Sequence, residues 1–137
     1  MKLSSTSIVR MKGVKQPLQD VVLRAAALCP IPFTVTEGLR THARQSELYA
    51  QGRTKPGKIV TWTMNSKHLT GDAVDLAPVT PTGAVDWTDV EAFEAIGKAM
   101  GRASMELRIP TRWGYDWDGD GRLREKGEYD GPHFELV

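Results

Sequence analysis

The chain has 137 residues, of which 40% are hydrophobic and 26% are charged, a composition typical of a globular domain that excludes a disordered or fibrous chain. Its length is that of one domain, which we expect to span residues 1–137. The net charge of +1 gives no reason to expect a nucleic-acid partner, and the single cysteine, Cys29, excludes an internal disulfide and a thiolate metal cluster.

The first half of the chain is expected to contain two helices and a short strand. Apolar residues recur every three or four positions over residues 16–29, and Pro17 suits the first turn of this helix. The residues at 33–36 are typical of a short strand. A second helix is expected over residues 42–51, with Thr41 as its N-cap.

The second half is expected to begin with a loop and to contain the longest helix. No period is present over residues 53–66, which indicates a loop, and alternation over residues 73–79 predicts a strand. The longest helix is expected to begin at a capping box formed by Thr88 and Glu91. Its apolar face continues as far as Arg108.

Two more short strands are expected near the C-terminal end, over residues 112–115 and 133–137. The sequence has no internal repeat and no low-complexity segment. Helices and strands in this order favour an α+β fold, with a small, mostly antiparallel sheet and flanking helices.

Two of the three histidines lie in motifs that suit a metal site. A turn containing Gly71 separates His68 from Asp75, and such a turn followed by a strand can bring a histidine beside a carboxylate. With His133 from a distant strand, these residues would form a three-ligand site with an open position, as in catalytic zinc sites. Imidazole and carboxylate ligands suit Zn²⁺, although Cu²⁺ or Ni²⁺ would also bind. The alternative to a metal site is that His68 is a core histidine hydrogen-bonded to Asp75. The third histidine, His42, is expected on the surface.

An acidic segment near the C-terminal end is a second candidate metal site. Oxygen-bearing side chains occupy its first, third and fifth positions and glycine its sixth, as in the first half of an EF-hand calcium loop. The twelfth position is Gly127, so Glu125 or Glu128 would have to replace the usual bidentate glutamate. The alternative is an ordinary acidic turn between strands. The expected Ca²⁺ ligands are Asp116, Asp118, Asp120 and Glu125.

Several motifs occur together in the order found in a known family. They are Ser66-x-His68-x-x-Gly71-x-Ala73-x-Asp75, Asp130-x-x-His133-Phe134-Glu135-Leu136, Gly38-Leu39-Arg40-Thr41 with Gln45, Leu48, Tyr49 and Gly52, and Arg112-Trp113-Gly114-x-Asp116-Trp117. With these motifs the sequence resembles the zinc peptidase family of D-alanyl-D-alanine carboxypeptidases and dipeptidases. Within that family it resembles in particular the short phage endolysins that are L-alanyl-D-glutamate endopeptidases.

The resemblance implies roles for individual residues. It implies that His68, Asp75 and His133 are the zinc ligands, and that Asp130 is the carboxylate that activates the attacking water. It also implies that Arg40 steadies the carbonyl or carboxylate of the substrate. From the residues alone, Asp130 would be interpreted as a turn residue and Arg40 as half of a surface salt bridge.

Two further residues have predicted roles near these ligands. Ser66 either binds substrate or holds its own loop. Glu135 shares a strand face with His133, which makes it a candidate hydrogen-bond partner for that ligand. The fold implied by the resemblance is the small α+β fold shared with the Hedgehog signalling domain.

The implied activity is zinc-dependent hydrolysis of the L-Ala-D-Glu bond of peptidoglycan by a monomeric catalytic domain. The alternatives are a D-Ala-D-Ala carboxypeptidase or dipeptidase, and an inactive Hedgehog-like binding module that keeps the fold and the metal. The first residues, MKLSSTSIVRMKG, lack the apolar region of a signal peptide. We therefore expect synthesis in the cytoplasm and release by a holin to the periplasm and cell wall.

Overall fold

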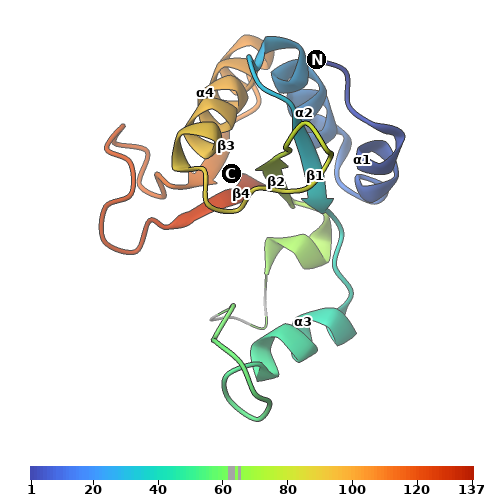
Figure 1. Ribbon diagram of the computed structural model, residues 1–137, viewed down its shortest axis with the longest axis vertical. Coiled ribbons are helices and arrows are strands. Elements are labelled where there is room, and N and C mark those ends of the chain that lie inside the picture. Colours follow the sequence, from blue (N-terminus) through green and yellow to red (C-terminus); the bar gives the residue numbers. More distant parts are fainter. Residues whose placement is uncertain (62–63, 65) are drawn as a thin grey trace.

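An antiparallel sheet forms the centre of the protein, for which the computed structural model describes residues 1–61, 64 and 66–137. Its strands are β1 (Phe33–Glu37), β2 (Ala73–Pro78), β3 (Thr111–Gly114) and β4 (Asp130–Leu136). They lie side by side in the order β1-β2-β4-β3. The helices are α1 (Ser5–Arg10), α2 (Gln16–Leu28), α3 (His42–Ala50), α4 (Val90–Leu107) and the short 3₁₀ helix η1 (Lys67–Thr70). The predicted α+β fold is confirmed (Figure 1).

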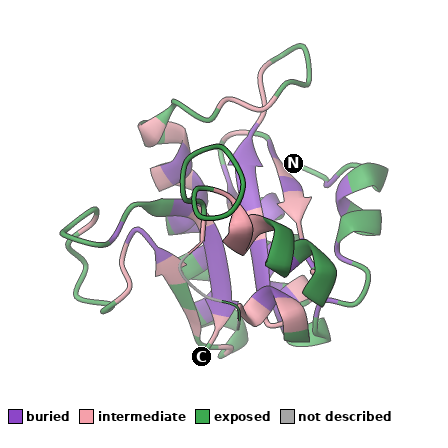
Figure 2. Cartoon of the chain, turned by 90° about the horizontal axis from the view of Figure 1, so that it is seen from below, coloured by how far each residue is buried: buried purple, intermediate pink, exposed green. Residues whose placement is uncertain are grey.

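The two faces of the sheet differ in character. Helices α2 and α4 pack together against one face, and α3 lies apart from both (Figure 1). On β2, Val74 and Leu76 belong to the hydrophobic core, so the side chain of Asp75 between them points to the other face. On β4, Phe134 belongs to the core and His133 lies on the other face. The central strands β2 and β4 are largely buried, whereas most residues of the connecting loops are exposed (Figure 2).

The longest helix, α4, does not begin with the predicted capping box. Asp89 is its N-cap, and the Asp89 carboxylate accepts a hydrogen bond of 3.1 Å from the backbone N–H of Ala92. The Thr88 hydroxyl instead donates to Asp86 Oδ1 at 2.7 Å. The prediction of Thr88 as the cap is therefore wrong, because Asp86 competes for its hydroxyl and the Asp89 carboxylate also interacts favourably with the helix dipole.

The other predicted elements are present, with shifts at their ends. Strand β4 begins at Asp130, before the predicted start, because Asp130 pairs with Gly114 at the end of β3. A Cβ atom at Gly114 would lie 1.8 Å from the Asp130 carbonyl oxygen, so this pairing requires glycine. Helix α1 was not predicted, and its 6 residues are too few to show a period.

The predicted loop over residues 53–66 contains none of the named helices or strands among its described residues. Positions 62, 63 and 65 of that prediction lie outside the described residues. In the described part of the chain, no helix combines the length and the apolar character needed to cross a bilayer.

Gly97 on α4 is expected to resist substitution because Trp113 of β3 packs directly on it. A Cβ atom at Gly97 would lie 2.2 Å from Trp113 Cζ2, whereas one at Gly101 would meet nothing within 4 Å. We expect Gly97→Ala to lower the free energy of unfolding by about 1–3 kcal/mol through overpacking. Gly101→Ala is the matched control and should raise it by up to about 1 kcal/mol through helix propensity. Urea unfolding of both variants measures the difference, and equal effects would contradict the close packing of Trp113.

Candidate active site

A cleft of about 820 Å³ opens on the face of the sheet that is turned away from α2 and α4. Six residues with predicted zinc-site or substrate roles line it: Arg40, Ser66, His68, Asp75, Asp130 and His133. His42 is exposed on α3 and does not line the cleft, as predicted. The fold therefore brings together residues that lie far apart in the sequence.

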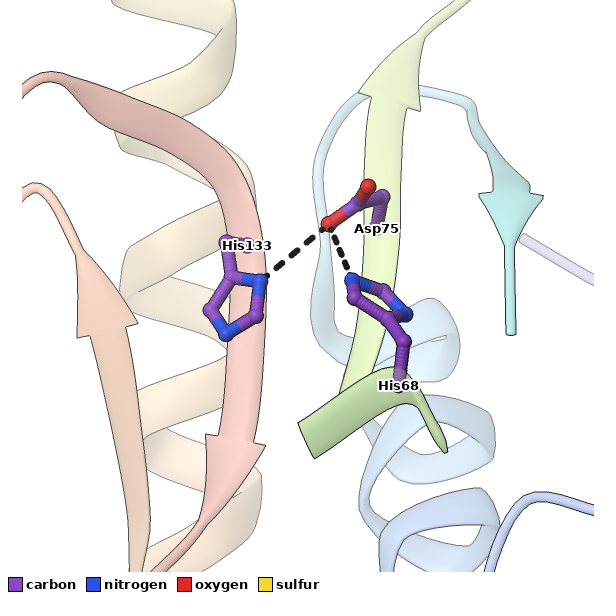
Figure 3. Close-up of side chains that lie close together, drawn as sticks. All are labelled: His68, Asp75 and His133. Carbon is purple, nitrogen blue, oxygen red and sulfur yellow. Dashed lines mark ion pairs between the residues drawn. The ribbon is translucent and has the colours of Figure 1, made fainter. Parts of the chain in front are cut away.

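His68, Asp75 and His133 meet inside this cleft (Figure 3). Asp75 on β2 and His133 on β4 are directly opposite each other in the sheet, and His68 comes from η1, just before β2. Asp75 Oδ1 lies 3.3 Å from His68 Nε2 and 3.5 Å from His133 Nδ1. One donor atom from each residue lies within 4.8 Å of the other two, so the group can hold a metal ion.

Each of these histidines uses its other ring nitrogen in a hydrogen bond that orients the ring. His68 Nδ1 lies 2.8 Å from the carbonyl oxygen of Gly38, and His133 Nε2 lies 2.8 Å from Glu135 Oε1. Burial opposes ionisation of Glu135, but His133 and Lys67 outweigh it and hold the pKa of Glu135 below its ordinary value. The Gly38 carbonyl oxygen and the Glu135 carboxylate therefore each accept a hydrogen bond from a ring N–H. His68 Nε2 and His133 Nδ1 are then left with lone pairs for a metal ion held between the three residues.

The polar environment of Asp75 favours a metal site over a satisfied polar core. Asp75 Oδ1 is buried and has no hydrogen-bond partner among the described residues. Burial disfavours the charged carboxylate, yet positive charge on the facing nitrogens of His133 and His68 outweighs burial and holds the pKa of Asp75 well below its ordinary value, so the three residues favour a positive charge, a proton or a metal ion, between them. Burial would lower the pKa of His133, but Asp75 raises it. A buried anionic oxygen that lacks a hydrogen bond and faces two ring nitrogens fits a bound cation.

Asp130 is the first residue of β4 and lies in the wall of the same cleft, not in a turn. Its side chain keeps contact with solvent. The protein atoms packed around its carboxyl, together with the negative charge of Asp75, raise the pKa of Asp130 above its ordinary value. A carboxylate with a raised pKa beside the His68, Asp75 and His133 group is suited to accept a proton from an attacking water.

A β-bulge in β1 adds Glu37 to the cleft. Val35 pairs with Leu76 and Glu37 pairs with Asp75, so β1 has one extra residue between these two pairs. In a regular strand, Glu37 would lie on the core side together with Val35, two residues before it, and the bulge turns it to the side of Asp75. Sequence reasoning missed Glu37 because nothing in the local pattern marks the bulge.

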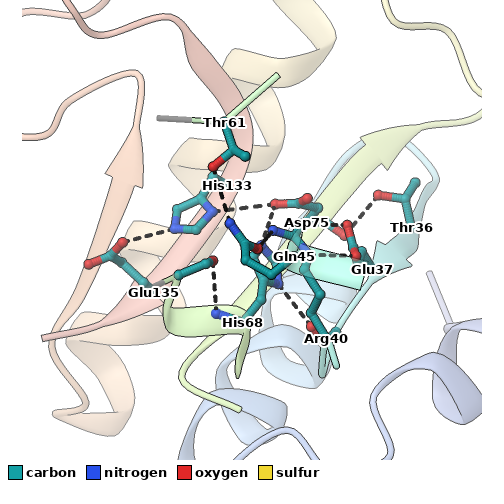
Figure 4. Close-up of polar contacts among 11 residues, drawn as sticks. Thr36, Glu37, Arg40, Gln45, Thr61, His68, Asp75, His133 and Glu135 are labelled. Carbon is teal, nitrogen blue, oxygen red and sulfur yellow. Dashed lines mark hydrogen bonds and ion pairs between the residues drawn. The ribbon is translucent and has the colours of Figure 1, made fainter. Parts of the chain in front are cut away.

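Glu37 and Gln45 hold the guanidinium of Arg40 (Figure 4). Arg40 Nε and Nη2 donate to the two oxygens of the Glu37 carboxylate at 2.8 and 2.7 Å, and Nη1 donates to Gln45 Oε1 at 2.7 Å. The Arg40 side chain is only 9% exposed, so this ion pair is not the surface salt bridge of the alternative interpretation. A guanidinium carries five N–H groups, which leaves donors for an oxygen of a substrate.

Ser66 is the N-cap of η1, and its hydroxyl accepts a hydrogen bond of 3.2 Å from the backbone N–H of His68. This contact supports the interpretation that Ser66 holds its own loop and thereby places His68. A contact between Ser66 and substrate stays a prediction.

Two tryptophans to which the sequence analysis assigned no role also line the cleft. The ring of Trp117 lies with its centre 5.3 Å from that of His133. Trp87 is 58% exposed although it belongs to the wall of the cleft. Trp87 stands alone between two elements and forms no motif, and Trp117 belongs to a motif whose spacing by itself assigns it no role.

The acidic segment forms a separate group beside the cleft, with Trp117 lining both. Asp116, Asp118 and Glu128 present donor atoms within 4.8 Å of one another, and Asp118, Asp120 and Glu125 form a second such group. The first group is the more buried, since Glu128 is only 5% exposed. Glu128 Oε1 and Asp116 Oδ1 are buried without a hydrogen-bond partner in the described structure. Glu128 therefore joins Asp116 and Asp118, whereas the predicted ligand Glu125 belongs to the exposed group.

Known sequences are similar to this chain over most of its length. A family model described as phage L-alanyl-D-glutamate peptidase matches residues 1–137. The L-alanyl-D-glutamate peptidase of Escherichia phage T5 is 41% identical over 142 residues, which cover 99% of this chain and 98% of that protein. The peptidoglycan L-alanyl-D-glutamate endopeptidase CwlK of Bacillus subtilis (strain 168) is 36% identical over 122 residues, 86% of this chain and 68% of that protein.

Solved structures give the same result for the fold. The L-Ala D-Glu endopeptidase ChiX of Serratia marcescens has a TM-score of 0.80 and 34% identity, and the match covers 100% of this chain and 90% of that chain. The vancomycin-resistance D,D-dipeptidase VanXYg, at 18% identity and a TM-score of 0.56 over 90% of this chain and 50% of that chain, shares the fold. The predicted family is thus confirmed, and the chain belongs to the phage L-alanyl-D-glutamate peptidases.

Proposed function

We propose that this protein is a zinc peptidase that hydrolyses the bond between L-alanine and D-glutamate in peptidoglycan stem peptides. The observation that carries the proposal is the convergence of His68 Nε2, His133 Nδ1 and a buried Asp75 oxygen that lacks a hydrogen bond. Two imidazoles and one carboxylate make a three-ligand set typical of catalytic zinc, with a further coordination position left for water or substrate.

The chain's own residues account for binding and proton transfer. When bound, Zn²⁺ supplies a Lewis acid for the peptide carbonyl and lowers the pKa of water. Asp130 accepts a proton from the attacking water and returns it to the leaving amine of D-glutamate. The pKa of Asp130 is raised toward the working pH, so the carboxyl group is better able both to accept the proton and to return it. Arg40, held by Glu37 and Gln45, donates to a carbonyl or carboxylate oxygen of the substrate.

The setting in which the protein acts is part of the proposal. The substrate is the peptidoglycan of the bacterial wall, reached from the cytoplasm through a holin, and the protein acts there as a monomer. The match to a phage peptidase family supports this setting. Expression with a holin should lyse cells that tolerate the protein alone.

Mass spectrometry of digested muropeptides tests the activity. Zinc-loaded protein should release peptides that begin with D-glutamate and leave N-acetylmuramoyl-L-alanine on the glycan. Loss of a C-terminal D-alanine would instead indicate a D,D-carboxypeptidase or dipeptidase. Intact muropeptides, with zinc bound at one equivalent, would indicate an inactive binding module. Either of the last two results would reject the proposed bond.

We further propose that Ca²⁺ binds in the acidic segment between Asp116, Asp118 and Glu128, with Asp120 and Glu125 at its exposed side. The support is the pair of buried oxygens without hydrogen bonds, Glu128 Oε1 and Asp116 Oδ1. Desolvation raises the pKa of Asp116, and the neighbouring carboxylates of Asp118 and Asp120 raise it further against the hydrogen bond from the Gly121 N–H. A divalent cation would relieve this repulsion and would order the segment that leads to Asp130. The missing glutamate at the twelfth position predicts a modest affinity, about micromolar to millimolar.

Calcium is expected to raise the melting temperature of the zinc-loaded protein. At about one hundred times the dissociation constant, binding should stabilise the fold by about 2.7 kcal/mol, which corresponds to several degrees. Glu128→Gln and the double variant Asp118→Ala/Asp120→Ala should lose this response. Asp20→Asn, an exposed carboxylate on α2, is the matched control and should keep it. Equal melting curves of the unchanged protein in calcium and in a calcium-selective chelator would leave the segment an ordinary acidic turn.

A further inference from the structure

Trp87 is an exposed aromatic side chain that the proposed chemistry does not use. It is 58% exposed and lines the same cleft as His68, Asp75 and His133. An indole left in contact with water at the wall of a polar cleft buries little apolar area in the free protein. It therefore offers a flat apolar face to whatever enters the cleft.

Contacts with neighbouring residues hold Trp87 in place. Its ring stacks on that of Phe93, with ring centres 6.3 Å apart and an angle of 25° between the planes. The backbone N–H of Asp86, the preceding residue, donates to the carbonyl oxygen of Pro78 at the end of β2, and Thr88 donates to the Asp86 carboxylate. Trp87 is thus held between the end of β2 and the start of α4, with its ring supported from one side.

The two ends of the cleft differ in chemistry. Trp87 lies at the Pro78 end of β2, where its ring stacks on the buried ring of Phe93 behind the cleft wall. At the other end, Ala73 of β2 pairs with Glu135, and the ammonium of Lys67 lies 3.0 Å from Glu135 Oε2. The two ends of β2 are separated by about 17 Å, given about 3.3 Å per strand residue. Asp75 lies between them, so the metal group has an exposed indole on one side and the Lys67–Glu135 ion pair on the other.

We propose that Trp87 stacks on the sugar ring of the N-acetylmuramic acid that carries the L-alanine, an inference that rests on the proposed function. In peptidoglycan the sugar is attached to the amino side of L-alanine, one residue from the bond to be cleaved. Its ring offers an extended C–H face that matches an indole. The other side of the bond carries carboxylates, and the cations Arg40 and Lys67 lie in the cleft lining. A cleft of about 820 Å³ lies toward the upper part of the range of ligand pockets, about 300–1,000 Å³, and so has room beyond the two amino acids of the bond.

Two substrates that differ only in the sugar test this role. One is the disaccharide tetrapeptide from peptidoglycan, and the other is the same tetrapeptide without the disaccharide. Zinc-loaded protein should prefer the glycosylated substrate by about tenfold in kcat/KM, which is the usual contribution of one aromatic side chain to binding. Trp87→Ala should lose that preference through KM and keep kcat/KM for the sugar-free peptide within about twofold. N-acetylmuramoyl-L-alanine, added as an inhibitor, should compete less well against this variant.

Two further variants separate recognition from folding. Trp87→Phe keeps a ring against Phe93 and should retain part of the preference. Met105→Ala, an 82% exposed apolar residue on α4 outside the cleft lining, is the matched control and should change neither substrate. Equal loss on both substrates in Trp87→Ala, or no preference in the unchanged protein, would overturn the sugar contact alone. Cleavage of neither substrate between L-alanine and D-glutamate would overturn the proposed function and this inference with it.

Discussion

Alanine in place of His133 or His68 is expected to remove both the bound zinc and the hydrolytic activity. Three protein ligands are the usual minimum for a catalytic zinc site, so the loss of one imidazole leaves the ion held by two groups. The acceleration typical of enzymes exceeds about 10⁶-fold, so we expect the activity to fall by at least about 10³-fold. The measurements are zinc per chain after gel filtration and the rate at which permeabilised Gram-negative cells lose turbidity.

The third histidine provides the matched control for this experiment. His42 is exposed on α3 and outside the cleft, so His42→Ala should keep both zinc and activity. Glu135→Gln should give an intermediate result, with zinc affinity reduced by about 10–100-fold, because Glu135 only orients the ring of His133. One equivalent of zinc in a folded His133→Ala variant would show that this residue is not a ligand.

Asp130→Asn is expected to separate catalysis from metal binding. The amide keeps the size of the carboxyl group but cannot accept the proton of the attacking water. We therefore expect kcat to fall by about 10²–10⁴-fold, while zinc stays near one equivalent. The matched control is Asp20→Asn, which makes the same change on the exposed surface of α2. The assignment of Asp130 as the base would be wrong if the variant lost its zinc or if it lysed cells at the unchanged rate.

The acidic segment illustrates how far spacing alone carries a prediction. Position counting indicated Asp116, Asp118 and Asp120 and left Glu125 and Glu128 as substitutes for the missing glutamate. Glu128 is the one buried beside Asp116, with an oxygen that lacks a hydrogen bond. Burial depends on how the segment folds against β3 and β4, so it could not be read from the distances along the chain.

Local patterns determined the elements and the motifs. The helix over residues 16–29 and the N-cap at Thr41 could be predicted because each depends on side chains within one or two turns of the backbone. The spacing of His68 and Asp75 around Gly71 likewise predicted that an imidazole and a carboxylate would meet. In the structure, Gly71 has a φ of 76°, a left-handed conformation that glycine adopts without strain, and β2 begins two residues later.

Tertiary structure alone decided which other side chains join the site. Glu37 reaches the cleft through a bulge whose position depends on the pairing of β1 with β2. Trp87 enters the cleft wall because Asp86 is tied to the end of β2 and Phe93 supports the ring. The physical reason is the same in both cases. A helix period or a cap is set by neighbours within one or two turns, whereas strand register and the packing of a lone ring are set by partners on other elements, such as Asp75 for Glu37 and Phe93 for Trp87.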